Sequence, residues 1–120
     1  MNPHFAIESG KLVVRDESSR AVLWRGDFDG YQVVKILPLA NTETCLVLLD
    51  PGGSTRPTFE NLFLVNQSGA VHWKAKLPRT NDAFADVFMR GDHIEACTWQ
   101  GIRVDLNAAT GETKQIGFAK

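Results

Sequence analysis

The side chains best suited to binding a metal ion are not spaced to act together. His4, His72 and His93 are far apart, and none has the partner spacing of a zinc motif. His93 and Cys97 are four residues apart, which in a strand separates them by roughly 13 Å along one face, too far to share an ion. The sequence therefore predicts no metal site and no cofactor.

Catalytic motifs are also missing from the sequence. Counting from Asp27, the glutamate that an EF-hand loop needs at its twelfth position is replaced by Pro38. The glycine-rich segment 51–56 lacks the Gly-Lys-Ser/Thr ending of a phosphate-binding loop. Because no nucleophile and base can be paired, we predict no catalytic residues and favour a binding module over an enzyme. The alternative is a small enzyme or small-molecule-binding protein that uses Asp and Glu side chains gathered in a pocket.

The most suggestive element for binding is the connection from Asp50 to Glu60. It places about eleven residues between two apolar strands, whereas most hairpin loops have ~2–5 residues. Arg56 adds hydrogen-bonding capacity, and loops on rigid sheets often carry binding sites. Trp99 precedes a predicted turn and is either a core residue or an aromatic anchor for a partner. We predict a binding site formed by Asp50, Arg56, Glu60 and Trp99; the alternative is an insertion without function.

Composition limits the class of protein. The 120 residues are 43% hydrophobic and 22% charged, which fits one globular domain spanning residues 1–120. The net charge is -1 and the basic residues are scattered, so nucleic acid is not an expected partner. No apolar run approaches the ~20 residues that cross a membrane. The N-terminal segment has no secretion signal, which predicts a cytoplasmic protein with Cys45 and Cys97 as unlinked core residues.

Alternation of apolar and polar residues predicts an all-β fold. Val71, Trp73, Ala75 and Leu77 share one face of an expected strand, whereas 45–49 is apolar at every position and predicts a strand covered on both faces. Turn signals separate about eleven expected strands. They lie near 5–9, 11–16, 20–25, 31–37, 44–49, 61–66, 70–77, 84–90, 93–99, 101–106 and 113–119. The segment 80–91 also fits a short helix, but the neighbouring strands favour a strand.

Three stretches repeat one pattern: a strand that ends in Asp or Asn, a tight turn and a returning strand. They are 10–24, 61–73 and 101–112. Asp and Asn side chains accept hydrogen bonds from backbone amides in such turns. The pattern resembles the outer hairpin of a PQQ-like propeller blade. The resemblance implies an antiparallel meander in propeller-like hairpin units, curled into a compact barrel or sandwich or forming an incomplete propeller.

The units implied by this resemblance are an N-terminal three-stranded fragment and two four-stranded repeats. Their ranges are 5–25, 31–78 and 82–119. Trp24 and Trp73 stand at equivalent ends of returning strands, and we expect both to pack between neighbouring sheets. The third repeat departs from this pattern, because it has Lys-Gln-Ile at 114–116 instead of a tryptophan.

Longer segments resemble a group of short, uncharacterised bacterial proteins with propeller-like β repeats, some of which are immunity-like. The segments are 46–51, 60–63, 69–73, 98–101, 105–111 and 118–120. The resemblance carries no catalytic residues. It implies a protein partner, with inhibition of a bacterial toxin as the most specific role.

An incomplete set of blades leaves unpaired strands at its two ends. We expect these edges near 5–9 and 113–119. Exposed strand edges tend to be covered or paired. The two segments are therefore expected to pair with each other or with a second copy of the chain, and we favour a homodimer.

Overall fold

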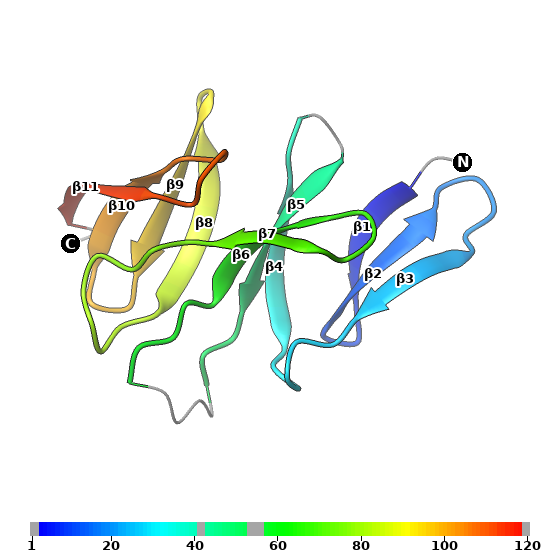
Figure 1. The fold of residues 1–120 in the computed structure, drawn as a ribbon, viewed down its shortest axis with the longest axis horizontal. Coiled ribbons are helices and arrows are strands. Elements are labelled where there is room, and N and C mark those ends of the chain that lie inside the picture. Colours follow the sequence, from blue (N-terminus) through cyan, green and yellow to red (C-terminus); the bar gives the residue numbers. More distant parts are fainter. Residues whose placement is uncertain (1–2, 41–42, 53–56, 119–120) are drawn as a thin grey trace.

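A computed structural model describes residues 3–40, 43–52 and 57–118, and over these residues the chain forms eleven strands in three antiparallel sheets with no helix (Figure 1). The N-terminal sheet contains β1 (Pro3–Glu8), β2 (Lys11–Asp16) and β3 (Val22–Gly26). The central sheet contains β4 (Val33–Pro38), β5 (Thr44–Leu49), β6 (Leu62–Asn66) and β7 (Val71–Lys74). The C-terminal sheet contains β8 (Phe84–Arg90), β9 (His93–Thr98), β10 (Ile102–Leu106) and β11 (Thr113–Phe118). The predicted all-β fold of antiparallel strands is confirmed.

Within each sheet, the strands follow one another in chain order, so every sheet is a meander. The segment that also fitted a helix is strand β8, as preferred from the sequence. In the part of the chain that the structure describes, the three sheets do not close into a barrel or a propeller.

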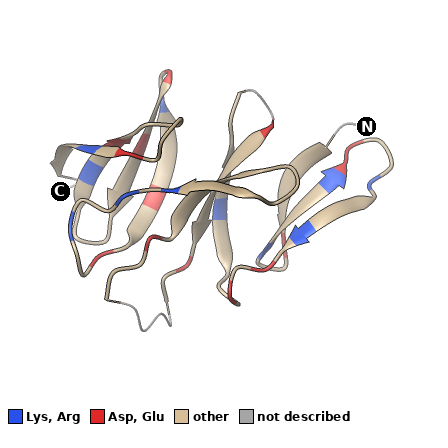
Figure 2. Cartoon of the chain, viewed as in Figure 1, with Lys and Arg blue, Asp and Glu red and all other residues tan. Residues whose placement is uncertain are grey.

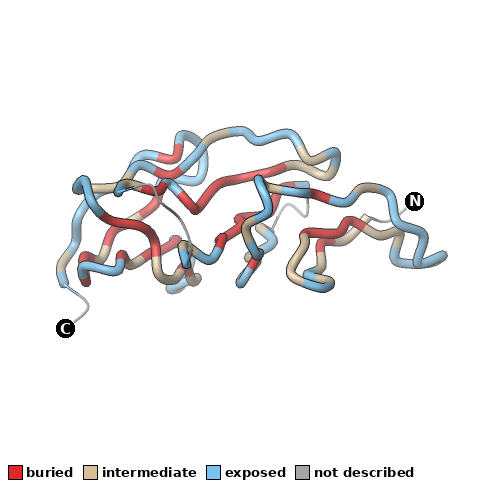
Figure 3. Tube along the Cα trace, turned by 90° about the horizontal axis from the view of Figure 1, so that it is seen from below, coloured by how far each residue is buried: buried red, intermediate tan, exposed pale blue. Residues whose placement is uncertain are grey.

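The central sheet is buried on both faces. Leu46 and Leu48 of β5 join the core shared with the C-terminal sheet, whereas Cys45, Val47 and Leu49 join the core shared with the N-terminal sheet. Figure 3 shows buried residues concentrated along the middle of the molecule. The prediction that 45–49 is covered on both faces is therefore confirmed. Each buried aliphatic side chain contributes about 1.5–3 kcal/mol to the free energy of unfolding.

Tryptophans in β3 and β7 connect consecutive sheets, as predicted. The Trp24 ring packs over Gly69, in the turn that joins β6 to β7. The Trp73 ring packs over Gly111, in the turn that joins β10 to β11, and its Nε1 donates a hydrogen bond to the Ala108 carbonyl at 3.0 Å. A glycine is required beneath each ring because a Cβ atom there would overlap it.

The predicted turn chemistry is present in all three repeats. The Asp16 carboxylate accepts a hydrogen bond from the Ser19 amide. The Asn66 and Asn107 side-chain oxygens accept hydrogen bonds from amides two residues ahead, at 3.0 and 2.8 Å. These bonds close the outer hairpin of each sheet, and in the central and C-terminal sheets the hairpin turn contains the glycine that lies under a tryptophan ring.

One predicted strand is shorter than expected. The expected strand 70–77 ends at Lys74, because the Lys76 amide leaves the sheet to donate to the Gly111 carbonyl at 3.0 Å. Val71 was expected on the core face but is 45% exposed, since the pairing of β6 with β7 shifts register between Val71 and Trp73 at the edge of the sheet. Trp73 and Ala75 do pack against the core.

The two expected edge strands lie in different sheets. β1 pairs only with β2, and β11 pairs only with β10, among the residues described. The expectation that these edges pair with each other within the chain is wrong, because the central sheet stands between their sheets. Pairing with a second copy stays a prediction.

A buried carboxylate lies on the outer face of the C-terminal sheet. Glu95 is 2% exposed and forms ion pairs with Arg90 at 2.9 Å and with Arg103 at 3.0 Å. Burial alone raises the pKa of Glu95, but the hydrogen bonds and charges of Arg103 and Arg90 outweigh burial and lower it. Both arginines therefore stabilise the ionised form of this carboxyl group.

The contact between Trp24 and Gly69 predicts a difference between two glycine substitutions. Gly69 and Gly91 both have a positive φ, but only Gly69 lies under a ring, since a Cβ atom at Gly91 meets nothing within 4 Å. We expect Gly69→Ala to lower the free energy of unfolding by about 1–3 kcal/mol more than Gly91→Ala. Urea unfolding of both variants checks this, and equal losses would show that the ring contact is dispensable.

The Glu95 ion pairs predict a pH dependence of stability. Because the pKa of Glu95 is lowered in the folded protein, its contribution is present above the unfolded pKa and is lost as the pH falls through the folded pKa. We expect Glu95→Gln to be less stable than the wild type at neutral pH, with the difference disappearing in acid. Unfolding curves across this range measure it, and a constant difference would contradict the assignment.

Candidate functional site

Loops from the central and C-terminal sheets meet at one end of the molecule, at the lower edge of Figure 1. The Phe59 amide donates to the Asp82 carbonyl at 3.0 Å, and the Trp99 amide donates to the Ala83 carbonyl at 3.0 Å. We call this end the loop face. It contains the described segments 27–32, 50–52, 57–61, 80–83 and 98–101. Backbone hydrogen bonds, not only side chains, therefore fix the positions of these loops.

Asn61 holds the loop face to the two sheets. Its side chain is fully buried, and its Nδ2 donates to the carbonyls of Leu49 at 2.7 Å and Phe84 at 2.9 Å. Its Oδ1 accepts a hydrogen bond from the Phe84 amide at 2.7 Å. One amide group thus links the end of β5 to the start of β8. The sequence analysis missed Asn61, for which the only signal is a polar residue directly before an apolar strand.

The segment before β8 is held from two sides. Asn81 has a φ of 56°, and its amide donates to Thr58 Oγ1 at 2.9 Å. On the other side, the Gln100 side chain donates to the carbonyls of Thr80 at 3.2 Å and Asn81 at 2.7 Å. The turn between β9 and β10 and the loop before β6 therefore clamp this segment between them.

Asp82 lies in the middle of this clamp and is only 5% exposed. Its Oδ1 accepts hydrogen bonds from the amides of Ala83 at 2.9 Å and Gln100 at 3.2 Å. Its Oδ2 has no hydrogen-bond partner among the residues described. Buried polar atoms are nearly always paired, so an unpaired carboxylate oxygen marks a position with unused binding capacity.

A hollow of about 480 Å³ opens beside Asp82, and we call it the Trp99 hollow. Trp99 is 65% exposed, the most exposed of the large apolar side chains that the structure describes. The hollow is lined by Asp50, Pro51, Gly52, Pro57, Phe59, Asn81, Asp82, Ala83, Trp99 and Gln100. It combines aromatic and carboxylate groups on loops with a fixed backbone.

A second hollow of about 210 Å³ lies on the other side of Phe59, and we call it the Lys74 hollow. It is lined by Asp27, Phe28, Asp29, Tyr31, Leu49, Phe59, Glu60, Phe63, Val71 and Lys74. The rings of Tyr31 and Phe59 are in contact, with centroids 4.6 Å apart. The Gly30 amide and the charge of Lys11 lower the pKa of Asp27, so this carboxylate is ionised at neutral pH.

The structure brings together part of the predicted binding site. Asp50 and Trp99, which are far apart in the sequence, line the same hollow. Glu60 lines the Lys74 hollow instead, because Phe59 lies between the two. Arg56 lies outside the described residues. The sequence analysis missed Asp82 and Gln100, and the run Asn-Asp at 81–82 was the only signal for the first.

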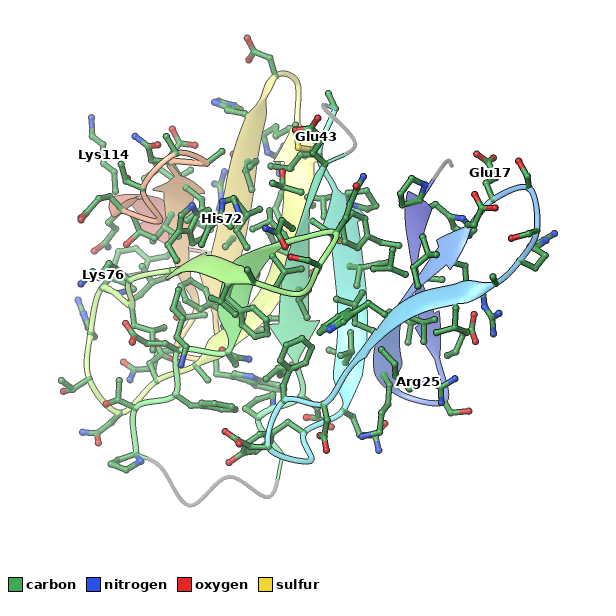
Figure 4. The ribbon with its side chains drawn as sticks, turned by 45° about the vertical axis from the view of Figure 1, so that its right-hand side comes forward. Glu17, Arg25, Glu43, His72, Lys76 and Lys114 are labelled. Carbon is green, nitrogen blue, oxygen red and sulfur yellow. The ribbon has the colours of Figure 1, made fainter. Side chains whose placement is uncertain are left out.

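Acidic side chains gather at the loop face, as Figure 2 shows along its lower loops. They are Asp27, Asp29, Asp50, Glu60 and Asp82. Away from this face, the exposed Lys114 projects from strand β11 (Figure 4). Among the described residues that line the two hollows, these five are acidic and Lys74 is basic.

The described part of the loop face gathers no thiol and no cluster of metal-ligating side chains. Both cysteines are free. Burial raises the pKa of Cys45 to about 12, and burial with the nearby Asp86 charge raises the pKa of Cys97, so both are protonated at neutral pH. No three His, Cys, Asp or Glu side chains are placed to hold a metal ion within the described ranges. The described residues also include no helix that is long and apolar enough to span a membrane.

A domain family of unknown function, DUF7957, matches residues 28–118, and the chain belongs to this family. The match covers the central and C-terminal sheets, while β1 to β3 lie before it. No curated protein matches the chain. The family description assigns no activity, so the PQQ-like and immunity-like relationships stay predictions.

The position of Asn61 predicts a large loss of stability when its side chain is removed. Asn61→Ala removes the side-chain hydrogen bonds to two carbonyls and one amide inside the protein. We expect the free energy of unfolding to fall by roughly 2–4 kcal/mol. Gln115→Ala, which removes an exposed amide from β11, is the control and should change stability by less than ~0.5 kcal/mol. Urea unfolding measures both, and similar small effects would show that Asn61 does not hold the sheets together.

Proposed function

We propose that this protein is a non-enzymatic binding module that docks onto another protein through the loop face. The observation that carries the proposal is the exposed Trp99 beside a hollow on hydrogen-bonded loops. Tryptophan is enriched among the residues that dominate the binding energy of protein interfaces. A loop that is already fixed also loses little conformational entropy when it binds.

The distribution of titratable groups supports binding over catalysis. Active sites usually gather groups with shifted pKa values in one pocket. Here the groups with shifted values are Glu8, Arg15, Asp27, Cys45, Glu95 and Cys97. Of these, only Asp27 borders a hollow of the loop face, where its shift comes from a turn amide and Lys11. A small enzyme or small-molecule-binding protein is the less supported alternative.

We also infer that the three sheets are propeller-like blades of an incomplete propeller. In support, β4 and β8, the first strands of the two larger sheets, lie close together, and β4 also lies close to β1. The equivalent tryptophan contacts to Gly69 and Gly111 link each sheet to the next in one repeated way. In its most specific form, the proposal makes the partner a bacterial toxin and this chain its cytoplasmic inhibitor, as the resemblance to immunity-like proteins implies.

The test compares how strongly two variants bind the partner. Each variant lacks one exposed apolar side chain, at a different place on the surface. Trp99→Ala alters the loop face, and Met89→Ala removes a 46% exposed side chain near the other end of β8. With the partner purified from the source cells, we expect Trp99→Ala to weaken binding by at least about 30-fold, equivalent to ~2 kcal/mol. Met89→Ala should bind as the wild type does. The proposal is wrong if no protein co-purifies, or if Trp99→Ala binds normally.

A further inference from the structure

Asp82 Oδ2, which has no described hydrogen-bond partner, indicates which kind of chemical group the Trp99 hollow can bind. Asp82 lines the hollow, and its Oδ1 is satisfied by two backbone amides while Oδ2 has no described partner. An ionised carboxylate oxygen accepts hydrogen bonds and donates none, so the group that pairs with it there is a donor. A positively charged donor gives the strongest bond and also compensates the buried charge.

The rest of the lining fits a planar cation. Asp50 provides a second carboxylate, whose Oδ1 already accepts the Gly52 amide at 2.9 Å. None of the described residues that line the hollow is Lys or Arg, so none of these residues neutralises the two carboxylates. Trp99 offers an exposed aromatic ring at the rim. Aromatic faces attract cations, and a guanidinium group stacks on them better than an ammonium group does.

We propose that the Trp99 hollow is a guanidinium-binding site that is filled, in the complex, by an arginine side chain of the partner protein. The guanidinium group donates to Asp82 Oδ2 and to the Asp50 carboxylate while it stacks on Trp99. Its five donors in one plane suit two carboxylates, whereas lysine offers a single point charge. The volume of about 480 Å³ is within the range of ~300–1,000 Å³ that ligand pockets occupy.

Binding at this site requires a small rearrangement. Asp82 Oδ2 is covered in the free protein, so its carboxylate or a neighbouring side chain must shift when the donor enters. Gln100 is the residue best placed to respond, because it is exposed and its backbone amide already donates to Asp82 Oδ1. The amide signals of Ala83 and Gln100 therefore report directly on what happens at the carboxylate.

The claim that the arginine belongs to a partner protein rests on the proposed docking function. The claim that the hollow binds a guanidinium group does not. The test uses N-acetyl-arginine methylamide as the probe and N-acetyl-citrulline methylamide, which has nearly the same shape without the charge, as its control. Nuclear magnetic resonance titration follows the amides of Ala83 and Gln100 and the indole of Trp99. We expect saturable shifts with the arginine probe and at least about tenfold weaker binding of the citrulline probe.

Variants separate this site from general electrostatic attraction. Asp82→Asn should lower the affinity for the arginine probe at least about tenfold, and so should Asp50→Asn, which changes an exposed residue. Trp99→Ala should lower this affinity about two- to fivefold. Asp92→Asn removes an exposed carboxylate from the turn between β8 and β9 and should change nothing. Asp50→Asn keeps the test decisive if Asp82→Asn does not fold.

The outcomes distinguish the two proposals. If the arginine probe does not bind, or the citrulline probe binds equally well, the guanidinium site is wrong even if a partner docks through Trp99. If Asp92→Asn weakens binding as much as Asp82→Asn and Asp50→Asn do, the attraction is nonspecific and the site is also wrong. If the probe binds as expected but no protein co-purifies, the site is correct for free guanidinium compounds, and the partner as the source is wrong.

Discussion

Burial of the central sheet on both faces is the constraint from which the rest of the structure follows. Leu46 and Leu48 need the C-terminal sheet to exclude water, and Val47 needs the N-terminal sheet. A strand with apolar side chains on both faces cannot be stable in a single exposed sheet. The three sheets must therefore stack, and the tryptophan contacts to Gly69 and Gly111 fix how each sheet meets the next.

Stacking also creates the loop face. When the central and C-terminal sheets pack together, the end of β5 comes close to the start of β8, and Asn61 satisfies the backbone groups left between them. The same packing brings Trp99 beside the segment that contains Asp82. Most polar groups there are paired, and the unpaired Asp82 oxygen is the exception. Natural sequences tend to break such local rules where they bind or react.

The sequence predicted local structure well because local rules decide it. Alternation located the strands, and Asp16, Asn66 and Asn107 were correctly assigned to the turns. The candidate site was predicted only in part. Asp50 and Trp99 share a hollow, but no local pattern shows that Phe59 separates them from Glu60. The roles of Asn61 and Asp82 depend on hydrogen bonds between segments far apart in the chain, which sequence spacing does not encode.

The family match begins after β3, although the N-terminal sheet packs against one face of the central sheet. The central claim is that all three sheets fold as one cooperative unit, and native-state hydrogen exchange tests it most directly. The amides of Val13, Val47 and Ala96 lie in inner strands of the three sheets. We predict that all three exchange through global unfolding, with one common free energy. Exchange of Val13 through a separate opening of clearly lower free energy would contradict the claim.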